Sequence, residues 1–214
     1  MDKQANGFNC DFVFCIDASQ VNGVKDLLLA FPRTFSNYMR DYERPEFSYR
    51  IKFILFGRSG KRYFLEESPF FAFDDEQGKY ETYILSLKPT GDRREDKNGL
   101  QALAHALHVD WLRDHPARRH FTILLTESGL IPLEELSKKA DYPAADPKTF
   151  MELKEMMDRE VDKHAQRLIL FLPEEEDLEL YEKIGYESMV VPVGDYRLKD
   201  VSTESLAMFV ARMI

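Results

Sequence analysis

The sequence predicts a single α/β domain in which helices cover both faces of a mainly parallel β-sheet. The apolar runs are continuous rather than alternating, which is typical of strands buried on both faces. Segments with apolar residues three and four positions apart separate these runs, as crossover helices do. The chain of 214 residues fits one domain of this class. Because no repeat, linker or change in composition divides the chain, we expect residues 1–214 to form that one domain.

The first elements are a strand, a long helix and a hairpin. The apolar run DFVFCID (11–17) predicts the first strand. Apolar residues at helical spacing over 24–42 predict a helix, and Pro32 predicts that this helix is kinked or split. The runs 47–57 and 61–67 flank the turn sequence GRSG, which predicts a hairpin. Its second strand is expected to be an antiparallel edge strand of the sheet.

The middle of the chain is less regular. Residues 68–91 are expected to be mostly irregular with a short helix, and the stripe from Leu100 to Trp111 predicts a further helix. The run HFTILLTE (120–127) predicts another strand. The Pro-containing, polar segment 129–147 that follows predicts a long surface loop.

The last third of the chain repeats the alternation. Apolar spacing over 150–157 predicts a helix, and the runs 167–173 and 188–194 predict the last two strands. An amphipathic segment from Ser202 to Ile214 predicts a closing helix. The order of these elements indicates a Rossmann-like, doubly wound fold with one antiparallel edge strand.

Composition excludes several classes of function. The net charge of −9 argues against a nucleic-acid-binding or membrane-surface protein, because both need clustered Lys and Arg. No apolar run approaches the roughly 18–20 residues of a membrane span, and the N-terminal sequence lacks a secretory signal. Cys10 and Cys15 are an odd number of residues apart on one predicted strand, so they should point to opposite faces and form no disulfide. We therefore expect a cytoplasmic protein.

Three acidic segments are expected to meet at one edge of the sheet. Asp17 ends the first strand and is followed by Ser19, Asp92 and Glu95 precede the helix at Leu100, and Glu127 ends the strand 120–127. In a doubly wound sheet, ligands bind beyond the carboxyl ends of the strands. Carboxylate and hydroxyl oxygens suit a hard cation such as Mg²⁺. The sequence therefore predicts a possible Mg²⁺ site formed by these five residues.

These segments also carry a family resemblance. After the first strand, DASQV resembles the D-x-S-x-S loop of the von Willebrand factor A domain family and matches it at Asp17 and Ser19. GDRRED (91–96) resembles the G-D-x-x-E-D loop of a branch that includes many microbial domains, and TE (126–127) stands where that family has TD. The likeness extends over nearly the whole chain. It implies a non-enzymatic interaction module whose metal site is completed by a carboxylate of a protein partner.

The departures from the family pattern all affect the metal site. Val21 stands in place of the second serine, Gln20 in place of a glycine, and Glu127 in place of an aspartate. One hydroxyl ligand is therefore missing from the set that the resemblance implies. We expect a degenerate site with weak or absent Mg²⁺ binding, so that the partner is held through that site or through the loops alone.

Two alternatives stay open. A Mg²⁺-dependent phosphohydrolase of the haloacid dehalogenase type also begins with an aspartate after a strand, but it needs a second aspartate two residues later, where this chain has Ser19. A structural subunit that binds no metal would share the predicted fold. The sequence has no G-x-S-x-G elbow and no Gly-rich phosphate loop, so we expect no enzyme. His105 and His108 lack a zinc-site spacing and are interpreted as solvated or capping residues.

Overall fold

The structure, a computed structural model, describes residues 7–42, 47–173, 181, 188–192 and 197–214. Its strands are β1 (Phe8–Asp17), β2 (Phe47–Ser59), β3 (Arg62–Glu67), β4 (Phe71–Ala72), β5 (Arg118–Leu125), β6 (Gln166–Leu172) and β7 (Ser188–Pro192). They form one sheet in the order β3-β2-β1-β5-β6-β7, with β4 also pairing with β2. Strands β2, β1, β5, β6 and β7 are parallel, whereas β3 and β4 run antiparallel to β2. The predicted fold class is therefore confirmed, and so is the antiparallel edge strand.

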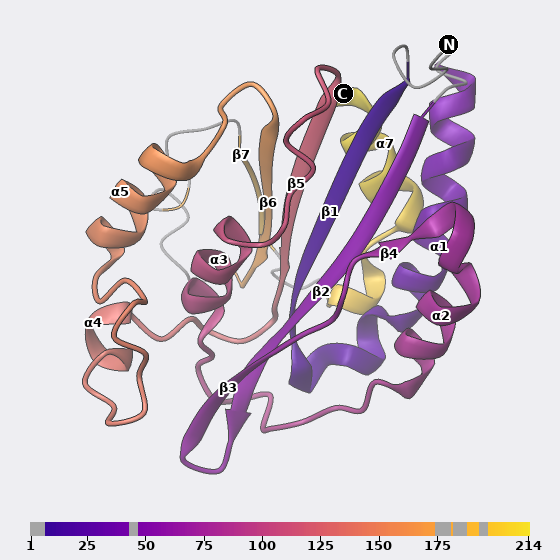
Figure 1. Cartoon of the computed structure of the whole chain (residues 1–214). Coiled ribbons are helices and arrows are strands. Elements are labelled where there is room, and N and C mark those ends of the chain that lie inside the picture. The colour runs from indigo at the N-terminus through magenta and orange to yellow at the C-terminus, as the bar shows by residue number, and fades with distance from the viewer. Residues whose placement is uncertain (1–6, 43–46, 174–180, 182–187, 193–196) are drawn as a thin grey trace.

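Helices cover both faces of this sheet (Figure 1). One face carries α1 (Val21–Asp41), α2 (Phe73–Ser86) and α7 (Thr203–Arg212), and the other carries α3 (Gly99–Leu107), α4 (Leu133–Leu136) and α5 (Phe150–Glu160). Short 3₁₀ turns, η2 (Ala18–Gln20) and η3 (Leu198–Asp200), precede α1 and α7. None of the helices in the described ranges combines the length and the apolar character that crossing a bilayer requires.

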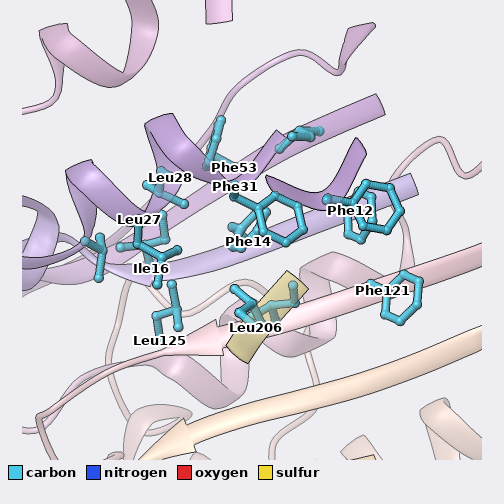
Figure 2. Close-up of a cluster of buried hydrophobic side chains, with 14 of the residues drawn as sticks. Phe12, Phe14, Ile16, Leu27, Leu28, Phe31, Phe53, Phe121, Leu125 and Leu206 are labelled. Atoms are coloured by element: carbon cyan, nitrogen blue, oxygen red, sulfur yellow. The ribbon is translucent and has the colours of Figure 1, made fainter. Parts of the chain in front are cut away.

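The central strand β1 divides its side chains between two apolar cores. Phe12 and Phe14 belong to the core under α1 and α7, whereas Val13 belongs to the core under α3 and α5. Figure 2 shows the first core, in which the rings of Phe12 and Phe121 stack with their centroids 5.1 Å apart. Burying one such ring contributes about 1.5–3 kcal/mol. Continuous apolar runs are thus explained by burial on both faces of the strand.

The same alternation separates the two cysteines. Cys10 lies in the first core and Cys15 in the second, and both side chains are buried. Burial, followed by the nearby negative charge of Glu67, raises the pKa of the Cys15 thiol far above its usual value. The expectation that the two side chains point to opposite faces of the strand is confirmed.

Helix α1 continues through Pro32, so of the two predicted outcomes, a kink or a split, the split is wrong. Proline has no N–H to donate to the carbonyl oxygen four residues earlier, which is that of Leu28. The hydroxyl of Tyr80 on α2 donates to that oxygen instead, at 2.6 Å. A tertiary hydrogen bond therefore replaces the missing helical one, and no local pattern around Pro32 could have indicated it.

Residues 68–91 contain the predicted helix, but the expectation that the segment is otherwise mostly irregular, with only a short helix, is wrong. That segment contains β4 and the 14-residue helix α2. Of α2 only Tyr80 and Ile84 are fully buried, and Glu76 departs from helical geometry, so its apolar pattern is faint in the sequence. Packing against α1 and β2 stabilises this helix more than its own periodicity does. The long loop at 129–147 is confirmed apart from the short helix α4, and the last two residues of the predicted strand 188–194 lie outside the described residues.

Candidate functional site at the carboxyl edge of the sheet

Asp17 is the last residue of β1 and is fully buried at the carboxyl edge of the parallel strands. The chain turns directly into η2, and Oδ1 of Asp17 caps this turn. It accepts hydrogen bonds from the backbone N–H of Ser19 at 2.9 Å and from the Ser19 hydroxyl at 2.8 Å. The D-x-S pattern read from the sequence thus forms a local turn in which serine binds aspartate.

The other carboxylate oxygen of Asp17 faces the loop after β5. The hydroxyls of Thr126 and Ser128 lie 3.2 Å and 2.7 Å from Oδ2. Ser128 also donates its backbone N–H to the Thr126 hydroxyl, at 3.0 Å, so the two residues form one compact turn. Protein hydroxyls and an N–H therefore surround both oxygens of this carboxylate.

The segment before α3 completes this site. The N–H of Thr90 donates to the carbonyl oxygen of Ala18 at 3.0 Å, and Nε of Arg93 donates to that of Ser19 at 3.3 Å. The Ser128 hydroxyl lies 3.0 Å from the carbonyl oxygen of Arg93. The loops after β1, before α3 and after β5 consequently meet at Asp17, as the sequence predicted.

The two predicted acidic ligands of the α3 loop are engaged elsewhere. Oε1 of Glu95 lies 3.4 Å from a guanidinium nitrogen of Arg58, and Oδ1 of Asp92 accepts the N–H of Arg94 at 3.0 Å. The ammonium group of Lys97 has no exposed surface and donates to the backbone carbonyl oxygens of both Asp92 and Glu95. A buried lysine therefore holds the backbone of this loop.

Glu127 is likewise used in a structural contact. Its Oε1 accepts the N–H of Leu198 at 2.6 Å, at the start of η3. Of the five predicted metal ligands, the structure joins Asp17 and Ser19 directly and gives Asp92, Glu95 and Glu127 other partners. Within the described ranges, no three Asp, Glu, His or Cys side chains are arranged to hold a metal ion. The residues present therefore fit a Mg²⁺ ion poorly, and the expected weak or absent binding stays a prediction.

Ser128 was not singled out by sequence reasoning, although it is the closest side-chain partner of Asp17. Thr126 was noted only as part of the TE pair. The available signal was the run TES directly after a buried strand, where hydroxyl side chains often bind a neighbouring turn. Only the parallel pairing of β1 with β5 brings that run to Asp17.

A second polar cluster surrounds His105 on α3. Its Nδ1 lies 3.1 Å from Oε1 of Glu67 on β3, and its Nε2 lies 3.4 Å from Oδ2 of Asp146. Burial raises the pKa of Glu67, but hydrogen bonds from His105 and Lys52 outweigh it and lower this pKa overall. His105 thus links an edge strand to the long loop, while its side chain, in the last turn of α3, stays 31% exposed. A cavity of about 180 Å³ lies beside it.

The fold and the edge site together define a doubly wound α/β protein with a closed polar cluster at the carboxyl ends of its strands. No family model and no curated protein matches the chain. Among solved structures it is similar to the pilus adhesin SpaC from Lactobacillus rhamnosus GG, with a TM-score of 0.53 and 11% sequence identity. The match covers 99% of this chain and 31% of the adhesin chain. At this identity the likeness shows the fold alone.

Proposed function

We propose that this chain is a non-enzymatic protein–protein interaction module of the von Willebrand factor A type. It binds a protein partner at the carboxyl edge of its sheet. The observation that carries the proposal is the meeting of three loops at Asp17. The carboxylate of Asp17 accepts four hydrogen bonds, two from Ser19 and one each from Thr126 and Ser128. Loops fixed on a rigid scaffold are the usual place for binding residues.

The loops themselves, rather than a metal ion, provide the contact in this proposal. The Asp17 carboxylate is already surrounded by protein donors, and Glu95 and Glu127 have other partners. A divalent ion would have to displace several of these hydrogen bonds before it could bind. The proposal includes a cytoplasmic location, the compartment expected for two cysteines that are buried on opposite faces of one strand.

The phosphohydrolase alternative is disfavoured by the surroundings of Asp17. A nucleophilic carboxylate must reach its substrate, yet Asp17 is fully buried. Its neighbour two residues later, Ser19, hydrogen-bonds to it and carries no carboxylate for acid–base catalysis. A metal-free structural subunit remains the second candidate, and it differs from the proposal by having no partner at this edge.

A steric block at one end of β2 tests the proposal. Ser59 is exposed at the carboxyl end of this strand and Ser48 is exposed at its amino end, so Ser59→Cys and Ser48→Cys form a matched pair. A polyethylene-glycol maleimide will label the new thiol, because the native cysteines are buried. Each labelled protein is then used to capture partners from the native host, with quantitative mass spectrometry as the readout.

We expect the labelled Ser59→Cys protein to lose a partner that the labelled Ser48→Cys protein and the unlabelled variants retain. Equal recovery with both labelled proteins, or loss only with Ser48→Cys, would contradict binding at the carboxyl edge. Phosphate release from p-nitrophenyl phosphate that disappears in an Asp17→Asn variant would instead support the hydrolase.

A further inference from the structure

Two neighbouring segments of this acidic protein carry a local excess of positive charge. Residues 58–62 and 88–97 together hold seven Lys or Arg and three Asp or Glu, whereas the whole chain has a net charge of −9. We call six of these side chains the basic edge: Arg58, Lys61, Arg62, Lys88, Arg93 and Arg94. A cluster of positive charge on a negatively charged protein creates a local positive potential, which attracts anionic groups of a ligand.

Direct contacts join the two segments into one surface. Because Asp17 at the end of β1 pairs with Phe56, the β2–β3 hairpin extends beyond the edge of the sheet (Figure 1). Gly91 packs so closely under this hairpin that a Cβ there would lie 2.3 Å from the carbonyl oxygen of Arg58. Its φ of +93° also favours glycine. The ion pair between Arg58 and Glu95 adds a second link.

Most cations of the basic edge have no acidic partner. Within the described ranges, Lys61, Arg62, Lys88 and Arg94 are exposed and form no salt bridge. Arg93 uses its Nε for the Ser19 carbonyl oxygen and is otherwise exposed. The exposed ammonium and guanidinium groups of the basic edge therefore offer unused N–H donors to a ligand.

The backbone that carries these cations is held firmly. The fully buried ammonium group of Lys97 binds the carbonyl oxygens of Asp92 and Glu95, on either side of Arg93 and Arg94. The N–H and the carbonyl oxygen of Lys97 pair in turn with Gly129 and Ile131. A loop fixed in this way loses little entropy when a ligand binds to it, which favours affinity.

We propose that the basic edge binds an acidic, extended segment of a protein partner through its Arg and Lys side chains, without a metal ion. This inference rests on the proposed function and names the chemical class of its partner. Guanidinium groups bind carboxylates through paired N–H donors, so Arg62, Arg93 and Arg94 are suited to successive Asp or Glu side chains.

A nucleic acid fits this surface less well. Asp92 and Asp96 are exposed among the cations, and the remainder of the chain carries the excess negative charge, so a long polyanion would be repelled. The ring of Tyr63 is half-buried and has the guanidinium of Arg58 over it at 5.5 Å, which limits its use as a stacking platform for a base.

The test measures binding of a fluorescent oligoglutamate peptide by anisotropy, with an oligothymidylate of equal length for comparison. The test variant is Arg62→Glu with Arg94→Glu. The matched control is Arg33→Glu with Arg113→Glu, which reverses two exposed arginines away from the basic edge. Circular dichroism and thermal unfolding of both variants verify folding.

We expect the parent and the control variant to bind the peptide, and the test variant to bind it roughly tenfold or more weakly. Binding should weaken as salt is raised and should be unchanged by EDTA. No peptide binding, equal losses in the two variants, loss in EDTA, or tighter binding of oligothymidylate would each overturn the proposal.

The outcome separates this inference from the proposed function. If the labelled Ser59→Cys protein loses its partner while the Arg62→Glu, Arg94→Glu variant still captures it, only the acidic-partner inference fails. If the labelled Ser59→Cys protein retains every partner, the proposed function fails, whatever the peptide does.

Discussion

At the residue scale, Asp17 shows how a carboxylate at the end of a strand can be bound on both oxygens by neighbouring protein donors. The aspartate and Ser19 stand where the resemblance to a metal-dependent adhesion loop requires them. Their oxygens are nevertheless turned toward each other and toward Ser128, within a fully buried cluster. Val21, in place of the second serine, belongs to the apolar core. The carboxylate therefore stabilises the meeting of three loops.

This arrangement predicts that Mg²⁺ will have little effect on stability. A ligand that binds the folded state with a concentration 100 times its Kd raises the free energy of unfolding by about 2.7 kcal/mol. We expect a gain well below about 1 kcal/mol in millimolar Mg²⁺ or Mn²⁺, because a cation would have to displace the protein donors that already bind Asp17. Urea unfolding with and without the metal measures the gain in the free energy of unfolding, and isothermal calorimetry measures the affinity for the metal. Micromolar binding would show that the cluster opens to admit a cation.

At the element scale, contacts between elements override local signals. Pro32 is tolerated inside α1 because the Tyr80 hydroxyl satisfies the carbonyl oxygen of Leu28. Tyr80 belongs to α2, a helix whose own sequence gives little sign of helical periodicity. Helix α1 thus depends on Tyr80 of α2 to satisfy the Leu28 carbonyl oxygen, and α2 depends on packing against α1 for its stability.

Removing the Tyr80 hydroxyl should therefore destabilise the protein. In Tyr80→Phe the buried carbonyl oxygen of Leu28 loses its donor, and we expect a loss of about 1–3 kcal/mol in the free energy of unfolding. The matched control is Tyr83→Phe, because the buried Tyr83 hydroxyl has no hydrogen-bond partner within the described part of the chain. That change should be neutral or slightly stabilising. Urea denaturation compares the two, and equal effects would contradict the role assigned to Tyr80.

The contact between β3 and α3 should contribute a pH-dependent increment of stability. Glu67 has a folded-state pKa lowered chiefly by His105 and Lys52, although burial opposes this. A lowered folded pKa means that the contribution is present above the unfolded pKa of about 4.3 and is lost as the pH falls through the folded pKa. Because the Glu67 side chain is 37% exposed, solvent screening limits the effect to below about 1 kcal/mol.

The variant Glu67→Gln tests this pH dependence. We expect Glu67→Gln to be less stable than the parent at pH 7 and nearly equal to it at a pH below the folded-state pKa of Glu67, where both side chains are neutral. The neighbouring Glu66→Gln is a control, since Glu66 is exposed and forms no salt bridge within the described residues. Thermal unfolding across this pH range measures the difference. A deficit of the same size at both pH values would contradict the ionic contribution.

At the scale of the whole molecule, one sheet separates two apolar cores, and β1 contributes to both. The aromatic residues Phe12, Phe14 and Phe31 dominate the core under α1, whereas aliphatic residues and Trp111 dominate the core under α3. Since the strands are buried on both sides, access to either core requires the domain to open.

The two cysteines report on that opening. Cys10 and Cys15 lie in different cores and are buried, and the thiol pKa of Cys15 is raised by burial. We expect iodoacetamide to leave both unmodified in native buffer at pH 8 and to modify both together across the urea transition. Mass spectrometry of quenched samples measures the extent of labelling. Modification of one cysteine well before the other would show that the two cores unfold separately.

The candidate site was predictable only in part. The sequence order of strands and loops indicated that Asp17, the α3 loop and the residues after β5 would meet, and the hydrogen bonds among them agree with this. The direction of each side chain was not predictable. Whether Glu127 faces Asp17 or Leu198 depends on where η3 lies, and η3 is distant in the sequence.

The chain's own pattern of apolar runs, helical stripes and the GRSG turn was sufficient to determine the doubly wound fold, its edge hairpin and the opposite facing of Cys10 and Cys15. Such features follow from local periodicity, because burial on two faces leaves a direct mark on consecutive residues. The unbroken α1, the helix α2 and the closed cluster at Asp17 were decided by tertiary contacts. Hydrogen bonds between residues 52, 109 and 111 positions apart made the difference, and partners so distant leave no periodic signal in the sequence.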